Sequence, residues 1–297
     1  MNTTAPNQLK ATLIGGTAVL MWGLLALFTT LTGQVPPFLL AALAFSVASG
    51  LVLIKWIVRG EDIRSYLSQP VGAWALGVTG LFGYHFFYFM ALRNAPPVEA
   101  GLIAYMWPLL IVLFSALLPG ERLRWWHVAG ALTGLVGAVL LVTGGKGVDG
   151  FKSEFLLGYL MATACALTWS TYSVVNRRFQ GVPTDTVGGF CAVTAMLAAG
   201  AHILFEETIW PADTGEWLAV MGLGLLPVGA AFFVWDYGTK HGNIQVLGAF
   251  AYAAPLISTL VLIAAGKGEA TWIVAIACLL IVGGALLASK DMLFKTD

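Results

Sequence analysis

Charged residues are scarce in this chain. Asp, Glu, Lys and Arg make up only 10% of its 297 residues, whereas hydrophobic residues make up 59%. A soluble domain carries about 25% charged residues, so this chain has too few polar groups to cover a surface that faces water. The composition excludes an ordinary soluble protein and predicts an integral membrane protein.

Cysteines and clustered polar groups are also few. The three cysteines, Cys165, Cys191 and Cys278, lie in apolar segments without C-x-x-C spacing, so we interpret them as packing residues. No basic run points to nucleic acid. The histidines are scattered, and no acid pair is placed to bind Mg²⁺ at a membrane face. We therefore expect no cofactor, no metal site, no nucleic-acid partner and no enzymatic activity, with a membrane-embedded lipid enzyme as a remote alternative.

Long apolar runs fill the chain instead. A helix crosses the hydrocarbon layer with about 20 apolar residues, and ten runs of that length are separated by short loops rich in Gly, Pro and charge. We expect an all-α integral membrane protein of ten transmembrane helices. The first run is too long for the core of a signal peptide and is expected to be retained. The predicted spans are 11–32, 36–57, 71–92, 97–118, 124–143, 155–176, 184–205, 215–237, 244–265 and 270–289.

The distribution of Lys and Arg predicts the orientation. If the N-terminus is cytoplasmic, eleven of the fifteen Lys and Arg residues fall on the cytoplasmic side, and four fall on the other side, namely Arg93, Lys146, Lys152 and Lys267. Short cytoplasmic loops carry an excess of these residues. Both termini are therefore predicted to lie in the cytoplasm.

The sequence matches itself at an offset of 147 positions. The phrase Ala-Tyr-x-x-Pro-Leu occurs at 104–109 and again at 251–256, and Trp22 is matched by Trp169. Further matches continue without a gap from position 22 to position 137. Each copy would hold five spans, which is an odd number, so the second copy would enter the membrane from the opposite side.

This pattern predicts two inverted five-helix repeats around a central cavity, with boundaries at 1–147 and 148–297. Many secondary transporters are built on that plan. Pro108 and Pro255 occupy equivalent positions in the two copies. A proline within a helix removes one N–H and displaces a carbonyl, which a membrane protein tolerates only where protein or water satisfies the freed group. We expect both prolines to face the bundle interior as hinge or gating residues, with an ordinary packing kink as the alternative.

Aromatic residues are concentrated near the middle of several spans, where the interfacial belts of membrane proteins do not explain them. A buried Tyr or Trp needs a partner for its O–H or N–H, and a cavity with a polar substrate supplies one. Ring faces also attract an ammonium group. We therefore expect a small zwitterion with an apolar side chain as substrate. The predicted substrate-binding residues are Trp22, Tyr84, His85, Tyr88, Tyr105, Trp107, Trp169, Tyr172, Trp235 and Tyr252. For His85, a satisfied interior histidine is the alternative.

Acidic residues are nearly absent from the predicted spans. Asp236 lies four residues before Lys240 near the end of the eighth span. We favour an interfacial ion pair whose lysine reaches the membrane surface over a proton carrier. No carboxylate lies deep in the first seven spans, so facilitated diffusion is expected rather than proton antiport.

The repeat, Trp22 and Trp169 at equivalent positions, and the A-Y-x-x-P-L phrase resemble the drug/metabolite transporter superfamily over nearly the whole chain. The aromatic stretch at 83–90, GYHFFYFM, and that at 104–110, AYMWPLL, are similar to its bacterial aromatic and neutral amino-acid exporter branch. The resemblance implies a basket-shaped bundle in a bacterial inner membrane that exports amino acids, chiefly aromatic ones. We expect the two halves to move the substrate by alternating access.

Other members of that superfamily give the alternatives, which are multidrug and nucleotide-sugar transport. The small multidrug relatives carry a Glu in the first span, and this sequence has none there, which argues against proton-coupled drug efflux. The expected partners are an amino-acid substrate and membrane lipid. The oligomeric state is left open, and a monomer is allowed.

Overall fold

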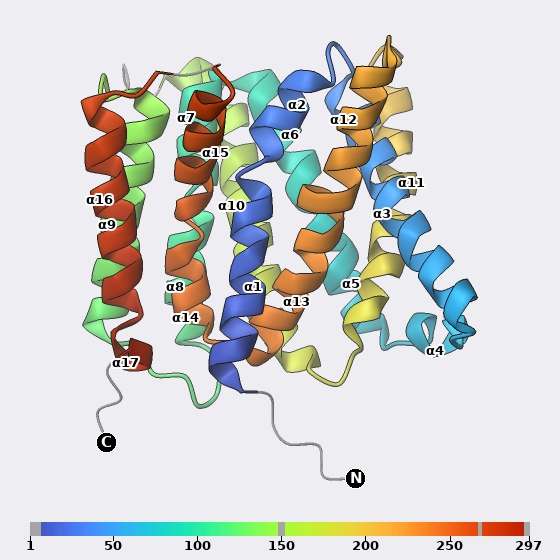
Figure 1. Ribbon diagram of the computed structural model, residues 1–297, viewed down its shortest axis with the longest axis horizontal. Coiled ribbons are helices and arrows are strands. Elements are labelled where there is room, and N and C mark those ends of the chain that lie inside the picture. The colour runs from blue at the N-terminus through green and yellow to red at the C-terminus, as the bar shows by residue number, and fades with distance from the viewer. Residues whose placement is uncertain (1–6, 148–151, 267–268, 294–297) are drawn as a thin grey trace.

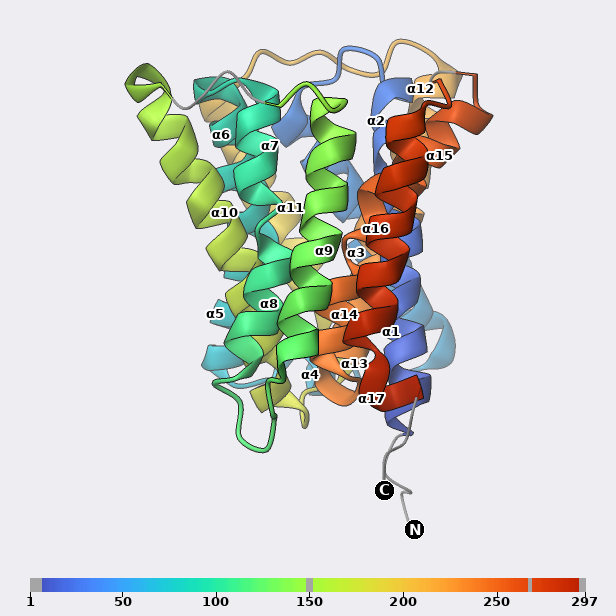
Figure 2. The same cartoon turned by 90° about the vertical axis from the view of Figure 1, so that its left-hand side faces the viewer.

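The computed structural model describes residues 7–147, 152–266 and 269–293. Helices are the only regular secondary structure in those ranges. The longer helices, and pairs of shorter consecutive helices, run between two opposite edges of the bundle (Figures 1 and 2). Helix α1 begins and α17 ends at the same edge, which is the lower one in Figure 1. We call it the lower edge below, and the opposite one the upper edge.

The first part of the chain forms nine α-helices and one π-helix, η1. Their bounds are α1 (Gln8–Trp22), α2 (Leu25–Leu31), α3 (Pro37–Arg59), α4 (Ile63–Leu67), α5 (Val71–Val78), η1 (Thr79–Gly83), α6 (Tyr84–Asn94), α7 (Pro97–Ala104), α8 (Trp107–Ser115) and α9 (Trp125–Thr143).

The second part contains another π-helix, η5, and three short 3₁₀ segments. Its elements are η2 (Ser153–Phe155), α10 (Leu156–Val175), η3 (Asn176–Phe179), η4 (Thr184–Thr186), α11 (Val187–Phe205), α12 (Thr214–Leu225), η5 (Leu226–Ala230), α13 (Ala231–His241), α14 (Ile244–Phe250), α15 (Ala253–Ala264), α16 (Trp272–Ala288) and α17 (Lys290–Leu293).

The predicted spans coincide with helical segments throughout. Eight segments of the described chain are long and apolar enough to cross a membrane. The last predicted span corresponds to the shorter apolar helix α16, and the sixth corresponds to α10, whose 20 residues include Tyr, Thr and Ser side chains. The chain is therefore an all-helical, multi-pass membrane protein, and the total of ten spans stays a prediction.

Several spans are interrupted near the middle of the bundle. Helix α1 ends at Trp22, and α2 starts after the turn formed by Gly23 and Leu24. A Cβ atom on Gly23 would lie 2.3 Å from Cγ2 of Ile257, so only glycine allows α15 to approach this turn so closely. The π-helices η1 and η5 interrupt two further spans. π-helical turns inside α-helices are frequent at functional sites.

The two predicted hinge prolines lie at breaks rather than within continuous helices. Helix α7 ends at Ala104, and Pro108 lies in the first turn of α8. Similarly, α14 ends at Phe250, and Pro255 lies in the first turn of α15. Proline fits a first turn because the N–H it lacks has no helical partner there. Both prolines are buried, as expected for residues that face the bundle interior.

Close packing of small residues holds the outermost helices together. Helices α9 and α16 lie side by side at one end of the bundle (Figures 1 and 2). A Cβ atom on Gly130 would lie 2.5 Å from the carbonyl oxygen of Gly284. A Cβ atom on Gly284 would likewise lie 2.5 Å from the carbonyl oxygen of Gly130. The two backbones therefore touch, as small residues allow between membrane helices. This pair supports the bundle away from the central helices.

Candidate functional site

A cavity of about 130 Å³ lies at the level of the helix breaks. It is enclosed by aromatic side chains from α1, α6, α8, α10 and α13, together with residues next to the breaks. The lining residues are Trp22, Leu25, Tyr84, His85, Tyr88, Ala104, Tyr105, Trp107, Trp169, Pro227, Val228, Phe232 and Ala254. The interruptions of the spans therefore surround a single central space.

Trp22 is the centre of the aromatic wall. Its ring centroid lies 5.7 Å from that of Trp169 and 6.0 Å from that of Trp107, both in edge-to-face geometry. Its indole N–H donates a hydrogen bond of 3.1 Å to the carbonyl oxygen of Pro227 in η5. A buried indole N–H needs such a partner. The π-helix thus fixes Trp22, which in turn positions two further tryptophans.

His85 is held by the other π-helix. Its Nδ1 lies 2.7 Å from the carbonyl oxygen of Leu81 in η1. A carbonyl oxygen can only accept a hydrogen bond, so Nδ1 carries the proton. In the neutral ring, Nε2 is then left as an acceptor. His85 therefore brings a hydrogen-bond acceptor to the cavity lining.

The cavity lining carries no formal charge. Among the described residues, none in contact with the cavity is Asp, Glu, Lys or Arg. Tyr84, Tyr88 and Tyr105 contribute hydroxyl groups, and Trp107 and Trp169 contribute indole rings. Tyr84 lies between Trp169, at 5.4 Å between centroids, and Tyr88, which stacks on it at 6.2 Å. This lining suits a neutral or zwitterionic molecule with an apolar part.

The structure brings seven of the ten sequence-predicted site residues together at the cavity, namely Trp22, Tyr84, His85, Tyr88, Tyr105, Trp107 and Trp169. The other three, Tyr172, Trp235 and Tyr252, are 1%, 0% and 0% exposed and do not line it. Trp235 donates its indole N–H to Ser173 at 3.1 Å. The hydroxyl of Tyr252 accepts the N–H of Leu109 at 3.2 Å.

Six lining residues were not expected from the sequence, and five of them are aliphatic: Leu25, Ala104, Pro227, Val228 and Ala254. Such residues carry no chemical signal by themselves. Phe232 could have been found, since it follows His85 by the repeat offset of 147 positions. Its ring centroid lies 6.2 Å from that of His85, in edge-to-face geometry.

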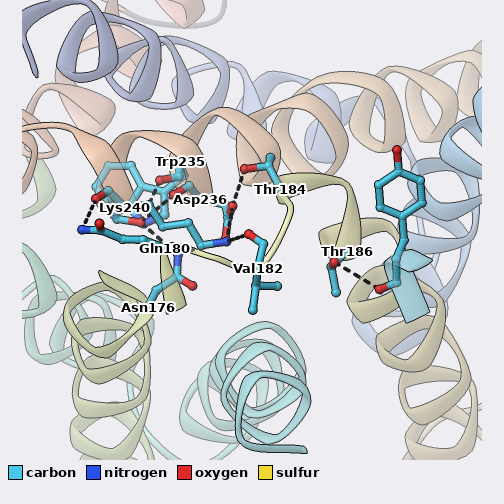
Figure 3. Close-up of polar contacts among 10 residues, drawn as sticks. Asn176, Gln180, Val182, Thr184, Thr186, Trp235, Asp236 and Lys240 are labelled. Carbon is cyan, nitrogen blue, oxygen red and sulfur yellow. Dashed lines mark hydrogen bonds and ion pairs between the residues drawn. The ribbon is translucent and has the colours of Figure 1, made fainter. Parts of the chain in front are cut away.

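A buried polar cluster lies beyond the cavity, toward the C-terminal ends of α10 and α13 (Figure 3). The Asp236 carboxylate pairs with the Lys240 ammonium at 2.9 Å, and these side chains are 0% and 2% exposed. Asn176 and Thr184 also donate to Asp236, at 2.9 Å and 2.7 Å. The expected ion pair therefore exists, but the expectation that its lysine reaches the surface was wrong, because the Lys240 side chain is buried in the protein. Protein partners, rather than water, stabilise both charges.

Comparison with known proteins identifies the relatives of this chain. The model of the EamA-like transporter family matches it twice, over residues 9–143 and 156–290. A relative from Ancylobacter novellus named aromatic amino acid exporter YddG is 57% identical over 280 residues, which cover 94% of this chain and 97% of that protein. The Escherichia coli K12 protein of the same name is 28% identical over 296 residues, covering 94% and 96%.

A solved crystal structure has the same fold. It is 55% identical in sequence, superposes with a TM-score of 0.90, and covers 96% of this chain and 99% of that one. A more distant relative, named biotin transporter in Escherichia coli K12, is 23% identical over 224 residues, covering 73% of this chain and 72% of that protein. The resemblance to the drug/metabolite transporter superfamily is thus confirmed, and the chain belongs to the EamA-like transporter family.

Proposed function

We propose that this protein exports neutral amino acids, chiefly aromatic ones, across a bacterial inner membrane by alternating access. The uncharged aromatic cavity carries the proposal. Its rings offer flat apolar surfaces to an aromatic side chain, hydroxyl and indole donors to a carboxylate, and π-faces and the Nε2 of His85 to an ammonium group. The name of the relative from Ancylobacter novellus, at 57% identity, supports the same substrate class.

We further propose that residues 1–147 and 148–297 are inverted five-helix repeats with ten spans in total. Several structural features recur at the sequence offset of 147. The π-helix Thr79–Gly83 has a counterpart at Leu226–Ala230, and α6 has one in α13 with equivalent bounds. The two matches to the family model are also offset by 147 at both ends. In Figure 1, α6 runs toward the upper edge and α13 toward the lower edge, as opposite insertion requires.

The orientation follows from the Lys and Arg distribution, which favours cytoplasmic termini. The lower edge, where α1 begins and α17 ends, would then face the cytoplasm. The breaks next to Pro108 and Pro255 divide two spans at the level of the cavity. Bending at these two breaks would let each half open and close its own end of the site. No carboxylate from the described part of the chain lines the cavity, which favours facilitated diffusion over proton antiport.

Transport by purified protein in liposomes tests the proposal. Labelled phenylalanine or tryptophan should equilibrate faster than in empty liposomes, and unlabelled aromatic amino acids should compete. Biotin and a nucleotide sugar serve as comparison substrates. The described residues place no Lys or Arg at the cavity to hold a phosphate, so the nucleotide sugar should not compete. If no amino acid moves faster than in empty liposomes, the proposed substrate class is wrong.

A further inference from the structure

The offset of 147 pairs each cavity residue with a residue of the other half. For three such pairs, both members line the cavity, namely Trp22 with Trp169, His85 with Phe232 and Trp107 with Ala254. These pairs lie where the two halves meet. They form the part of the site that is common to both halves.

The remaining seven lining residues behave differently, because none of their counterparts lines the cavity. Leu25, Tyr88 and Tyr105 have as counterparts Tyr172, Trp235 and Tyr252, which are 1%, 0% and 0% exposed. The other four counterparts, Gly80, Leu81, Ala231 and Ala251, are buried as well. The cavity therefore occupies one half of a nearly symmetric site, and the counterpart residues on the other half are buried.

Direction along the helices shows which half is filled. In α10 and α13, the cavity residues Trp169 and Phe232 are followed by buried Tyr172 and Trp235, toward the lower edge. In α6, which runs toward the upper edge, Tyr84 and Tyr88 both line the cavity. This structure is thus closed below the shared residues and hollow above them.

The environment of Tyr172 separately supports a second conformation of the buried half of the site. Its hydroxyl is buried and has no hydrogen-bond partner among the described residues. A Cβ atom on Gly80 would lie 2.5 Å from its ring, so the ring is pressed against the π-helix η1. A buried hydroxyl without a partner costs free energy, and such a group calls for an explanation beyond packing. A cavity with water and substrate around Tyr172 would satisfy it.

We propose that in the state open to the lower edge, Tyr172, Trp235 and Tyr252 form the substrate lining in place of Leu25, Tyr88 and Tyr105. Trp22, His85, Trp169 and Phe232 remain in contact with the substrate in both states. This inference rests on the proposed alternating access. The exchanged residues offer similar chemistry, since each set of three contains two tyrosine hydroxyls and no formal charge. Tyr84, whose counterpart is Ala231, adds a third hydroxyl only to the form seen here.

Accessibility to a membrane-impermeant thiol reagent tests the proposal. Tyr252→Cys and Trp235→Cys should react in inside-out vesicles, which expose the cytoplasmic face, and phenylalanine should slow that reaction at least several-fold. Tyr88→Cys should react in right-side-out vesicles instead. Ile281→Cys is the matched control, because Ile281 is buried between α16 and α9, away from the cavity. The unmodified chain gives the background from Cys165, Cys191 and Cys278.

The outcome separates this proposal from the proposed function. If Tyr252→Cys and Trp235→Cys still transport phenylalanine but neither variant reacts from either face, the exchange of lining residues is wrong and transport stands. The conservative variant Tyr172→Phe covers the case in which the cysteine variants do not fold. We expect it to raise the half-saturating phenylalanine concentration on the cytoplasmic side about three- to tenfold, without lowering thermal stability. A merely structural Tyr172 would leave that concentration unchanged, which would overturn the proposal.

Discussion

The hydroxyl of Tyr252 accepts a hydrogen bond of 3.2 Å from the backbone N–H of Leu109. Tyr252 belongs to the second A-Y-x-x-P-L phrase, and Leu109 ends the first. The two copies of this motif are therefore in direct contact in the folded protein. The equivalent bond, from the N–H of Leu256 to the hydroxyl of Tyr105, is not among the hydrogen bonds of the described residues, and Tyr105 lines the cavity instead. The two copies thus share a sequence but differ in their contacts.

Replacing Tyr252 with Phe should destabilise the arrangement seen here. The variant removes one hydrogen bond to a backbone N–H, which is worth about 0.5–1.5 kcal/mol. We expect a lower thermal unfolding midpoint in detergent for Tyr252→Phe. Tyr105→Phe is the matched control, because it removes the equivalent hydroxyl without removing this bond. Equal midpoints for the two variants would contradict a stabilising role for the Tyr252 hydroxyl.

Breaking the buried ion pair should have a much larger effect. Asp236→Asn leaves the Lys240 ammonium buried without a charged partner, and removing one member of such a pair costs about 3–5 kcal/mol. We expect a large loss of thermal stability, or failure to fold. The double variant with Lys240→Met should recover part of the loss. Glu154→Gln breaks the exposed pair with Lys152, whose side chains are both 63% exposed, and should change little. Similar losses of thermal stability for Asp236→Asn and Glu154→Gln would contradict the conclusion that burial makes the Asp236–Lys240 pair costly to break.

His85→Phe should impair recognition of the ammonium group specifically. The variant makes this position match Phe232 and removes the Nε2 acceptor. A hydrogen bond to a charged group is worth about 1.5–3 kcal/mol, so phenylalanine should bind roughly ten- to a hundredfold more weakly. Competition by 3-phenylpropionate, which lacks the ammonium group, should weaken far less. A parallel loss for both compounds would indicate that His85 acts only through packing.

Gly23→Ala tests the close approach of α15 to the break between α1 and α2. The added Cβ would lie 2.3 Å from Cγ2 and 2.7 Å from Cβ of Ile257. Overpacking of this kind costs about 1–3 kcal/mol, and it should also displace the neighbouring Trp22 and reduce transport. Gly50→Ala in α3 meets nothing within 4 Å and should be neutral or slightly stabilising. Unchanged stability and transport for Gly23→Ala would show that this approach is not tight.

The spans and most of the site could be predicted because local sequence governs both. Lipid requires each crossing segment to satisfy its own backbone, so apolar run length predicts helices directly. Mid-span aromatics without an interfacial role pointed to seven residues that meet at the cavity. Phe232 was missed because a phenylalanine in an apolar span carries no distinguishing signal, although the repeat offset relates it to His85.

Tertiary packing determined the environments of equivalent residues, which the same local sequence pattern could not distinguish. The sequence determined where prolines and tyrosines stand in each copy, but the structure determined that Tyr105 lines the cavity while Tyr252 is buried against Leu109. Tertiary packing also buries the Asp236–Lys240 pair. Asn176 and Thr184, which are distant from it in the sequence, donate hydrogen bonds to Asp236 there. Burial and partner choice depend on which helices meet. Two copies of one sequence pattern can therefore occupy different environments within one fold.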